Sequence, residues 1–247
     1  YDTVLINGSI AVDIGANIGL HTFSMADKVL PNGKVFAFEP EPVVFHKFKR
    51  RIAELIHYKS VIELSPLAFS SDAGESEFYS DYSDCAYSSF KIRPGAKGHH
   101  LQKIMVKTVT IDLFFKDIPF INFIKIDTEG ADYWVLCGGK DCIRKHQPIV
   151  VFEYGEYGNI AGSSDEMWSF WEDLNYEVFN ILGEPLSKKE EFVVSSKEQK
   201  VWNYVAIPKE YFKKKEILMN LAAYCKTFVL KGRRPDPPLR CNYLVVL

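Results

Sequence analysis

The sequence lacks long apolar runs, an excess of charge of either sign, and paired cysteines. No stretch approaches the roughly 18 or more apolar residues of a membrane-spanning helix. The net charge of −2 over 247 residues argues against a surface that coats nucleic acid. The five cysteines are scattered without a C-x-x-C pair, which indicates reduced thiols and disfavours a cysteine metal site. We therefore expect a cytoplasmic globular protein that neither spans a membrane nor binds nucleic acid.

The sequence contains instead an alternation of predicted strands and helices through about residue 155, which is typical of a mainly parallel sheet with helices on both faces. Two later apolar segments, 176–181 and 202–207, are predicted to complete this sheet as an antiparallel edge. We therefore predict an α/β fold, with residues 1–210 as one domain and 211–247 as a C-terminal helix and basic tail. Because the chain starts at Tyr1 and enters its first strand almost at once, we consider it a candidate for an excised domain.

The segment 11–19 predicts a strand that ends in a glycine turn and opens a helix. Gly15 and Gly19 lack the Cβ atoms that would keep the backbone away from a bound molecule or a neighbouring helix. Their G-x-x-x-G spacing follows Asp13, whereas a dinucleotide fingerprint has G-x-G-x-x-G spacing. A carboxylate repels a phosphate and attracts an ammonium or sulfonium group. The motif therefore favours S-adenosylmethionine (SAM), although such a turn is also a good generic connection between a strand and a helix.

A second acidic residue follows the next predicted strand, 34–38. Glu39, followed by Pro40, stands where an acidic residue of a βαβ nucleotide fold accepts hydrogen bonds from both ribose hydroxyls. The helix between the two strands is predicted from apolar residues at helical spacing, and Pro31-Asn32-Gly33 stops it. Two candidate ligand contacts thus belong to one βαβ unit.

Three more carboxylates lie at the ends of two later predicted strands. Asp127 and Glu129 come after the apolar strand 123–126, and Glu153 ends the strand 148–153. Ligands bind at this edge of open α/β sheets, so a functional role is favoured, with helix capping by Asp127 or Thr128 as the structural alternative. Lys125 is predicted to be a buried lysine paired with a carboxylate, for which Glu153 is the suggested partner.

In combination, these motifs resemble the FkbM family of SAM-dependent methyltransferases over about residues 10–155. The resemblance is carried by Val12–Gly19 with His21-Thr22, by Phe38-Glu39-Pro40, by Ile124–Asp132 and by Pro148–Glu153. It implies a Rossmann-like class I methyltransferase fold and O-methylation of a sugar or secondary metabolite. Asp132 stands where the family more often has Glu. The cofactor-binding residues that the resemblance implies are Asp13, Gly15, Ala16, Asn17, Gly19, Thr22, Glu39, Pro40, Ala68, Phe69 and Asp127.

Methyl transfer to a hydroxyl needs aligned reactants and a group that removes the hydroxyl proton. The candidate catalytic residues are Asp127, Glu129, Glu153 and His21. The three carboxylates could instead gather a divalent cation, Mg²⁺ or Mn²⁺, which would acidify a bound hydroxyl. The sequence does not separate these two schemes, and His21 is at least as well suited to packing or capping.

The polar segment 80–103 contains aromatic residues without a clear period, so it is predicted to be a long loop that covers the acceptor as a lid. The expected partner is a small hydroxylated molecule. Two other functions are considered: a catalytically silent domain that retains the SAM fold, and an NAD-dependent oxidoreductase. The glycine spacing and Asp13 disfavour the oxidoreductase, and the three acidic strand ends disfavour the silent domain.

Overall fold

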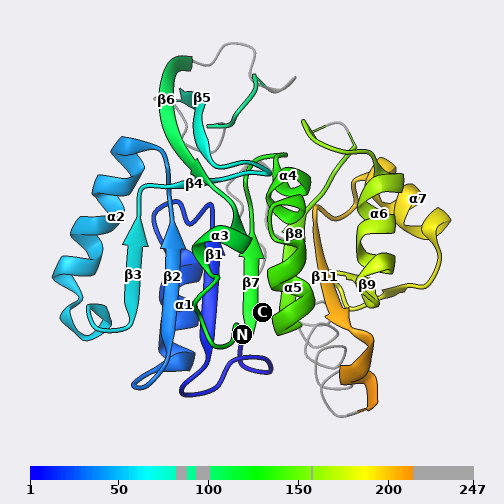
Figure 1. The fold of residues 1–247 in the computed structure, drawn as a ribbon, viewed down its shortest axis with the longest axis horizontal. Helices are drawn as coiled ribbons and strands as arrows, with labels where there is room; N and C mark the ends of the chain where they lie inside the picture. Colours follow the sequence, from blue (N-terminus) through cyan, green and yellow to red (C-terminus); the bar gives the residue numbers. More distant parts are fainter. Residues whose placement is uncertain (82–87, 93–100, 157, 214–247) are drawn as a thin grey trace.

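The computed structural model describes residues 1–81, 88–92, 101–156 and 158–213. An eight-stranded sheet forms its centre, in the order β10-β9-β11-β8-β7-β1-β2-β3 (Figure 1). Five of its strands run parallel to one another, namely β1 (Ile10–Ile14), β2 (Lys34–Phe38), β3 (Ile62–Ser65), β7 (Phe123–Ile126) and β8 (Ile149–Glu153). This arrangement confirms the predicted Rossmann-like α/β fold.

The antiparallel part of the sheet is also confirmed. It contains β9 (Tyr176–Asn180), β10 (Pro185–Leu186) and β11 (Asn203–Pro208). The short β10 forms the edge, while β11 runs antiparallel between β8 and β9 rather than outermost. Five consecutive residues of β11, 204–208, are buried, which suits a strand with neighbours on both sides better than an edge strand.

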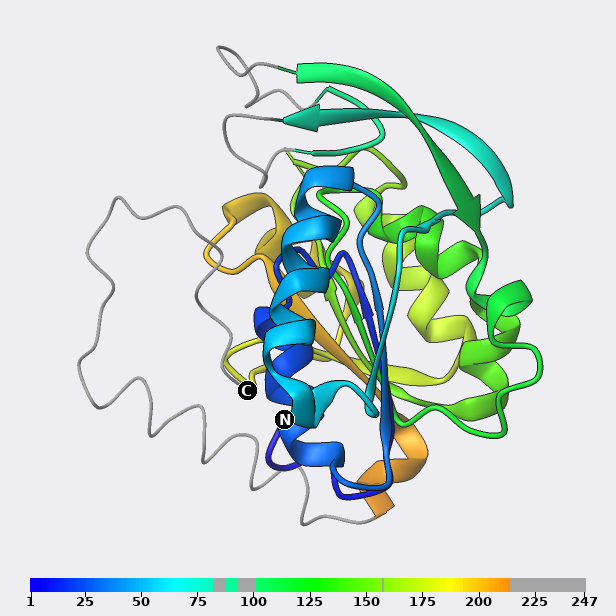
Figure 2. The ribbon, with the colours of Figure 1, turned by 90° about the vertical axis from the view of Figure 1, so that its left-hand side faces the viewer.

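Helices cover both faces of the sheet (Figure 2). One face packs against α1 (Leu20–Val29) and α2 (Pro42–Glu54), and the other against α3 (Ile111–Phe114), α4 (Asp132–Cys137), α5 (Lys140–His146), α6 (Ser164–Asp173) and α7 (Lys189–Glu198). From the sequence, α2 is predicted to bury a stripe of Val44, Phe48, Ile52 and Ile56, and the first three are buried. The fourth position is wrong, because α2 ends at Glu54 and Ile56 lies exposed in the short helix η1 (Ile56–Tyr58).

A second, three-stranded sheet projects beyond the end of the main sheet at which the parallel strands terminate (Figures 1 and 2). It consists of β4 (Ala68–Phe69), β5 (Gly74–Asp81) and β6 (Leu101–Val109), with β5 and β6 paired antiparallel as one hairpin. The predicted loop 80–103 is therefore corrected at both ends, since residues 80–81 and 101–103 belong to these strands. Most side chains of β6 are exposed or half-buried, which explains the missing apolar period. Residues 82–87 and 93–100 of the predicted lid lie outside the described residues.

Only the start of the predicted C-terminal helix and basic tail, 211–247, lies within the described residues. Residues up to 213 form the short helix η3 (Lys209–Lys213), and the remainder of the expected helix and basic tail lies outside the described residues. Within the described part of the chain, no helix has both the length and the apolar character needed to cross a bilayer.

Candidate active site

The turn after β1 owes its shape to two glycines. Gly15 has a φ of 81°, and a Cβ atom added there would lie 1.9 Å from the backbone oxygen of Asp127. Gly19 has a φ of 86°, and its added Cβ would lie 2.0 Å from the ring of Phe48 on α2. Both residues thus serve close packing, of the turn against the end of β7 and of α1 against α2. A direct contact of either glycine with a ligand stays a prediction.

Asp13 lies beneath this turn, with its side chain enclosed. Thr22 donates a hydrogen bond of 2.6 Å from its hydroxyl to Asp13 Oδ2, and Lys125 Nζ lies 3.7 Å from Asp13 Oδ1. Thr22 and Asp13 have no exposed surface. The structure therefore assigns both residues to a buried polar network, and their expected contact with the cationic groups of SAM stays a prediction.

Lys125 on β7 joins two of the predicted carboxylates. Its Nζ lies 3.0 Å from Asp127 Oδ2, in addition to the contact with Asp13. The predicted buried and paired lysine is confirmed, with Asp127 and Asp13 as partners, and the suggested pairing with Glu153 stays a prediction. Alternation along β7 directs Lys125 to the side where β1 contributes Asp13 as the paired residue in the sheet register.

Charge around Asp127 sets its ionisation. Burial acts to raise the pKa of Asp127, but the Lys125 ammonium outweighs burial and lowers the pKa below the usual 3.8. His21 lies in the same network, and its Nδ1 is 2.7 Å from the Tyr1 hydroxyl oxygen. Burial, together with Lys125, lowers the pKa of His21. At neutral pH the site therefore contains an ionised Asp127 and a neutral His21.

The three predicted catalytic carboxylates come together. Asp127, Glu129 and Glu153 each offer an oxygen, and these oxygens all lie within 4.8 Å of one another. Glu129 and Gly130 have φ values of 54° and 94°, so the chain makes a left-handed turn after β7. This turn places the Glu129 side chain beside those of Asp127 and Glu153. We call these residues the carboxylate cluster. Three oxygen donors at this spacing suit either proton transfer or a hard divalent cation.

The helix-capping alternative for Asp127 and Thr128 is wrong. The residue before α4 is Ala131, whose side chain cannot cap, and Thr128 instead donates its backbone N–H (3.0 Å) and its hydroxyl (2.6 Å) to Asp132. The other oxygen of Asp132 accepts from the Glu153 backbone N–H at 2.8 Å. Asp132 thus ties the end of β7 to the end of β8, and burial raises its pKa to about 6. Its position in the motif was noted from the sequence, but this bridging role was not.

Glu39 lies at the end of β2 against the same turn. Its two carboxylate oxygens accept backbone N–H groups from Asn17 and Glu41, both at 2.9 Å. Burial raises the pKa of Glu39 to about 7, while these hydrogen bonds act in the opposite direction. Glu41, which follows Pro40, caps α2 through the Val44 N–H and accepts the Ser80 hydroxyl at 2.8 Å. Sequence reasoning missed this link between α2 and the hairpin.

Ala68 and Phe69, which the family resemblance places near the adenine of SAM, have packed side chains. The Phe69 ring lies among three other phenylalanines, with its centroid 4.6 Å from that of Phe38, and Ala68 packs with Phe78 and Val106. Ala16, in the turn, is also buried. Any contact of Ala68 and Phe69 with adenine would therefore come from backbone atoms, and it stays a prediction.

The strand order, the glycine turn after β1 and the acidic strand ends define a class I methyltransferase domain. A family model described as the Methyltransferase FkbM domain matches residues 13–178, which is more than half of the chain. The chain therefore belongs to the FkbM methyltransferase family, and this membership supports methyl transfer as its general activity.

Solved structures with a similar fold include Methyltransferase FkbM from Methylobacillus flagellatus, which is 16% identical with a TM-score of 0.49. That match covers 81% of this chain and 43% of the other, so this chain spans less than half of that protein's length. A putative rRNA methylase from Clostridium thermocellum is 11% identical, with a TM-score of 0.50 and coverage of 84% and 89%. At such identities the likeness concerns the fold alone. A comparison with curated protein sequences finds no match.

Proposed function

We propose that this domain binds SAM at the β1 and β2 ends of the sheet and transfers its methyl group to a hydroxyl of a sugar or secondary metabolite. The carboxylate cluster carries the proposal, because Asp127, Glu129 and Glu153 converge at the edge where ligands of α/β sheets bind. The family match supports the methyl transfer. The acceptor class rests on resemblance to family members.

The residues of the site have distinct proposed roles. Bound SAM would supply a methyl group on a positively charged sulfur for transfer to the acceptor oxygen, and Glu39 would hold its ribose. A carboxylate of the cluster would take up the proton that the acceptor hydroxyl loses. Alignment of the two reactants contributes on the order of 7–11 kcal/mol, and a general base adds about 10²–10⁴-fold in rate.

Within the cluster, Asp127 is the best placed base on charge, because Lys125 keeps it ionised. Glu129, Glu153 and His21 remain the other candidates, although the Nδ1 of His21 is already hydrogen-bonded to Tyr1. In the alternative scheme, Asp127, Glu129 and Glu153 would hold Mg²⁺ or Mn²⁺, which would supply the positive charge that acidifies an acceptor hydroxyl. The all-oxygen donor set fits either cation.

Amide substitution tests both schemes. Asp127→Asn and Glu129→Gln should each lower turnover about 10²-fold or more, with SAM affinity near that of the wild type by calorimetry. Asp141→Asn, at an exposed carboxylate of α5 that pairs with Arg144, serves as the control with normal turnover. If a cation is needed, chelation of the wild-type enzyme should cause a comparable loss that Mg²⁺ or Mn²⁺ restores.

Binding measurements separate the other functions. Thermal shifts with SAM and with its demethylated product, but not with NAD, are expected for the methyltransferase and contradict the oxidoreductase. SAM binding without turnover on hydroxylated small molecules would favour the silent domain. An RNA substrate belongs in the same assay, because one structure of similar fold is a putative rRNA methylase; methylation of RNA in preference to small molecules would overturn the proposed acceptor.

A further inference from the structure

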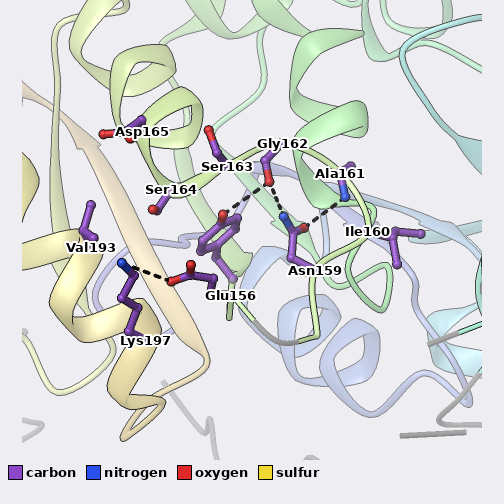
Figure 3. A pocket seen from close by; sticks show the side chains of 11 residues that line it. Glu156, Asn159, Ile160, Ala161, Gly162, Ser163, Ser164, Asp165, Val193 and Lys197 are labelled. Carbon is purple, nitrogen blue, oxygen red and sulfur yellow. Dashed lines mark hydrogen bonds and ion pairs between the residues drawn. The ribbon is translucent and has the colours of Figure 1, made fainter. Parts of the chain in front are cut away.

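A cavity of about 460 Å³ lies between the segment that follows β8 and the helices α6 and α7 (Figure 3). We call it the α6–α7 cavity. Its volume falls within the range of about 300–1,000 Å³ that is usual for small-molecule sites. The lining residues that matter for its chemistry are Glu156, Ile160, Ser164, Asp165, Val193 and Lys197.

The wall of this cavity is joined to the carboxylate cluster. Glu153 of the cluster ends β8, and the cavity lining begins at the next residue, Tyr154. Ile160 donates its backbone N–H to the oxygen of Gly130 at 3.0 Å, and Gly130 directly follows Glu129. Glu153 and Glu156 are three residues apart, which limits their Cα separation to about 11 Å. The lining of the cavity therefore lies within about 11 Å of the cluster, measured between the Cα atoms of Glu156 and Glu153, a separation that a ligand longer than one sugar ring would span.

The charges of the lining nearly cancel. Glu156 pairs with Lys197 at 3.9 Å, and Asp165 pairs with Lys189 at 3.0 Å. The start of α6 is already capped, since Ser163 accepts the Glu166 N–H and Glu166 accepts the Ser163 N–H. This capping box uses the backbone N–H groups of Ser163 and Glu166, so these two are not available to an anion at the helix end. Because its charged side chains are already paired, the lining offers no unpaired charge to a phosphate or an organic cation.

The lining is polar as well as aliphatic. Carboxylate, ammonium and hydroxyl groups are contributed by Glu156, Lys197 and Ser164, and the side chains of Glu156 and Lys197 are 42% and 53% exposed. Val193 and Ile160 add aliphatic surface. A saccharide matches this combination. Its hydroxyls both donate to carboxylates and accept from ammonium groups, and the apolar C–H faces of its ring suit the aliphatic side chains.

From these observations we propose that the α6–α7 cavity binds the non-reacting part of a saccharide acceptor, while the hydroxyl to be methylated lies at the carboxylate cluster. The acceptor is then a glycoside or oligosaccharide rather than a single sugar. This inference rests on the proposed function for its second half only, because saccharide binding in the cavity does not require methyl transfer.

Filling the cavity provides the test. Val193→Trp adds a bulky side chain on α7 inside the cavity, and Val194→Trp adds the same side chain at the next position, which is 52% exposed and does not line it. The readout is binding of each protein, with S-adenosylhomocysteine present, to an immobilised panel of methyl glycosides and disaccharides. Unfolding midpoints of both variants establish that they fold.

Binding of disaccharides by the wild type, weakened at least tenfold in Val193→Trp and less than twofold in Val194→Trp, supports the proposal. Equal binding by the two folded variants, or a wild type that binds no saccharide of the panel, overturns it. If Val193→Trp fails to fold, Lys197→Met replaces it, with Lys188→Met as control, and the same criteria apply. Asp127→Asn should retain saccharide binding while losing turnover. Saccharide binding by a wild type that methylates no hydroxyl would defeat the proposed function and leave the cavity assignment standing.

Discussion

Two lysine–carboxylate contacts show how differently the sheet edge and the hairpin are built. At the sheet edge, Lys125 and Asp127 lie 3.0 Å apart with side chains that are 5% and 18% exposed. On the hairpin, Lys103 of β6 and Glu77 of β5 lie 2.5 Å apart, but both side chains are more than half exposed. Water and ions screen the second pair and hardly reach the first.

The difference separates a region that fixes ionisation from one that is free to vary. A buried lysine without its carboxylates would be an uncompensated charge, and so would buried carboxylates without their lysine. The stability of each of Lys125, Asp13 and Asp127 in its buried position therefore depends on the other two. The hairpin charges have no such dependence. We therefore expect substitutions of the buried charges at the sheet edge to alter stability and chemistry together, and substitutions of the exposed hairpin charges to alter neither.

The largest effect is expected for Lys125→Met. It leaves Asp13 and Asp127 buried without their cation, which should lower the free energy of unfolding by about 3–5 kcal/mol in urea titrations at pH 7. The Lys125 contact depresses the pKa of Asp127, so its stabilisation is complete above about pH 4 and fades as the pH falls further. The variant should accordingly lose less stability in acid than the wild type. A variant as stable as the wild type at pH 7 would contradict the buried network.

A smaller effect is expected when two glycines of positive φ are compared. Gly15→Ala and Gly8→Ala impose similar backbone strain, since the φ values are 81° and 88°. The added Cβ meets the Asp127 oxygen at position 15 and nothing within 4 Å at position 8. The difference in unfolding free energy between the two variants, about 1–3 kcal/mol, then measures the close approach alone. Equal losses would show that strain, and not packing, requires Gly15.

The pH dependence of SAM binding should follow Glu39, whose pKa is raised to about 7 by burial. Ribose hydroxyls donate to the ionised form, so protonation weakens binding as the pH falls. Between pH 8 and pH 6 we expect the calorimetric Kd to rise about tenfold, or about 1.4 kcal/mol. Glu39→Gln carries no titrating group and should lack this component, while it retains any pH effect from SAM itself. The same slope in both proteins would remove Glu39 from the site.

The smallest effect is expected on the hairpin. Lys103→Met removes the exposed contact with Glu77, and neither the unfolding midpoint nor SAM affinity should change measurably. Set beside Lys125→Met, this variant tests whether burial, and not the mere presence of an ion pair, decides the outcome. A comparable loss of stability in both variants would contradict the contrast between the two regions.

The sequence predicted those parts of the molecule that are encoded by neighbouring residues. The buried strands β1, β2, β7 and β8 are short apolar runs, and each has an acidic residue close to its C-terminal end, either within the strand or directly after it. Since the ends of parallel strands share one edge, the convergence of Asp127, Glu129 and Glu153 followed from the pattern. The helix α7 was missed because it is mostly polar, with only Phe192 and Ser196 buried among its ten residues.

Contacts between segments that are distant in the sequence could not be predicted from the residue pattern. The partners of Lys125 depend on the register of β7 beside β1, which the order of residues does not give. The bridge from Asp132 to the end of β8 and the bond from Ser80 to Glu41 likewise join separate elements. Such contacts are set by how the elements pack, so a single sequence names the residues without naming their partners.

The close approach at Gly15 changes what the glycine motif can reveal about a protein. The neighbouring backbone of Asp127, rather than a ligand, already forbids a side chain there, and the Phe48 ring does the same at Gly19. A descendant of this domain that lost all catalysis would still need both glycines in order to fold. The glycines therefore diagnose ancestry and architecture. Evidence for an active enzyme must come from measured methyl transfer, with the three acidic side chains at the ends of β7 and β8 as the first positions to test.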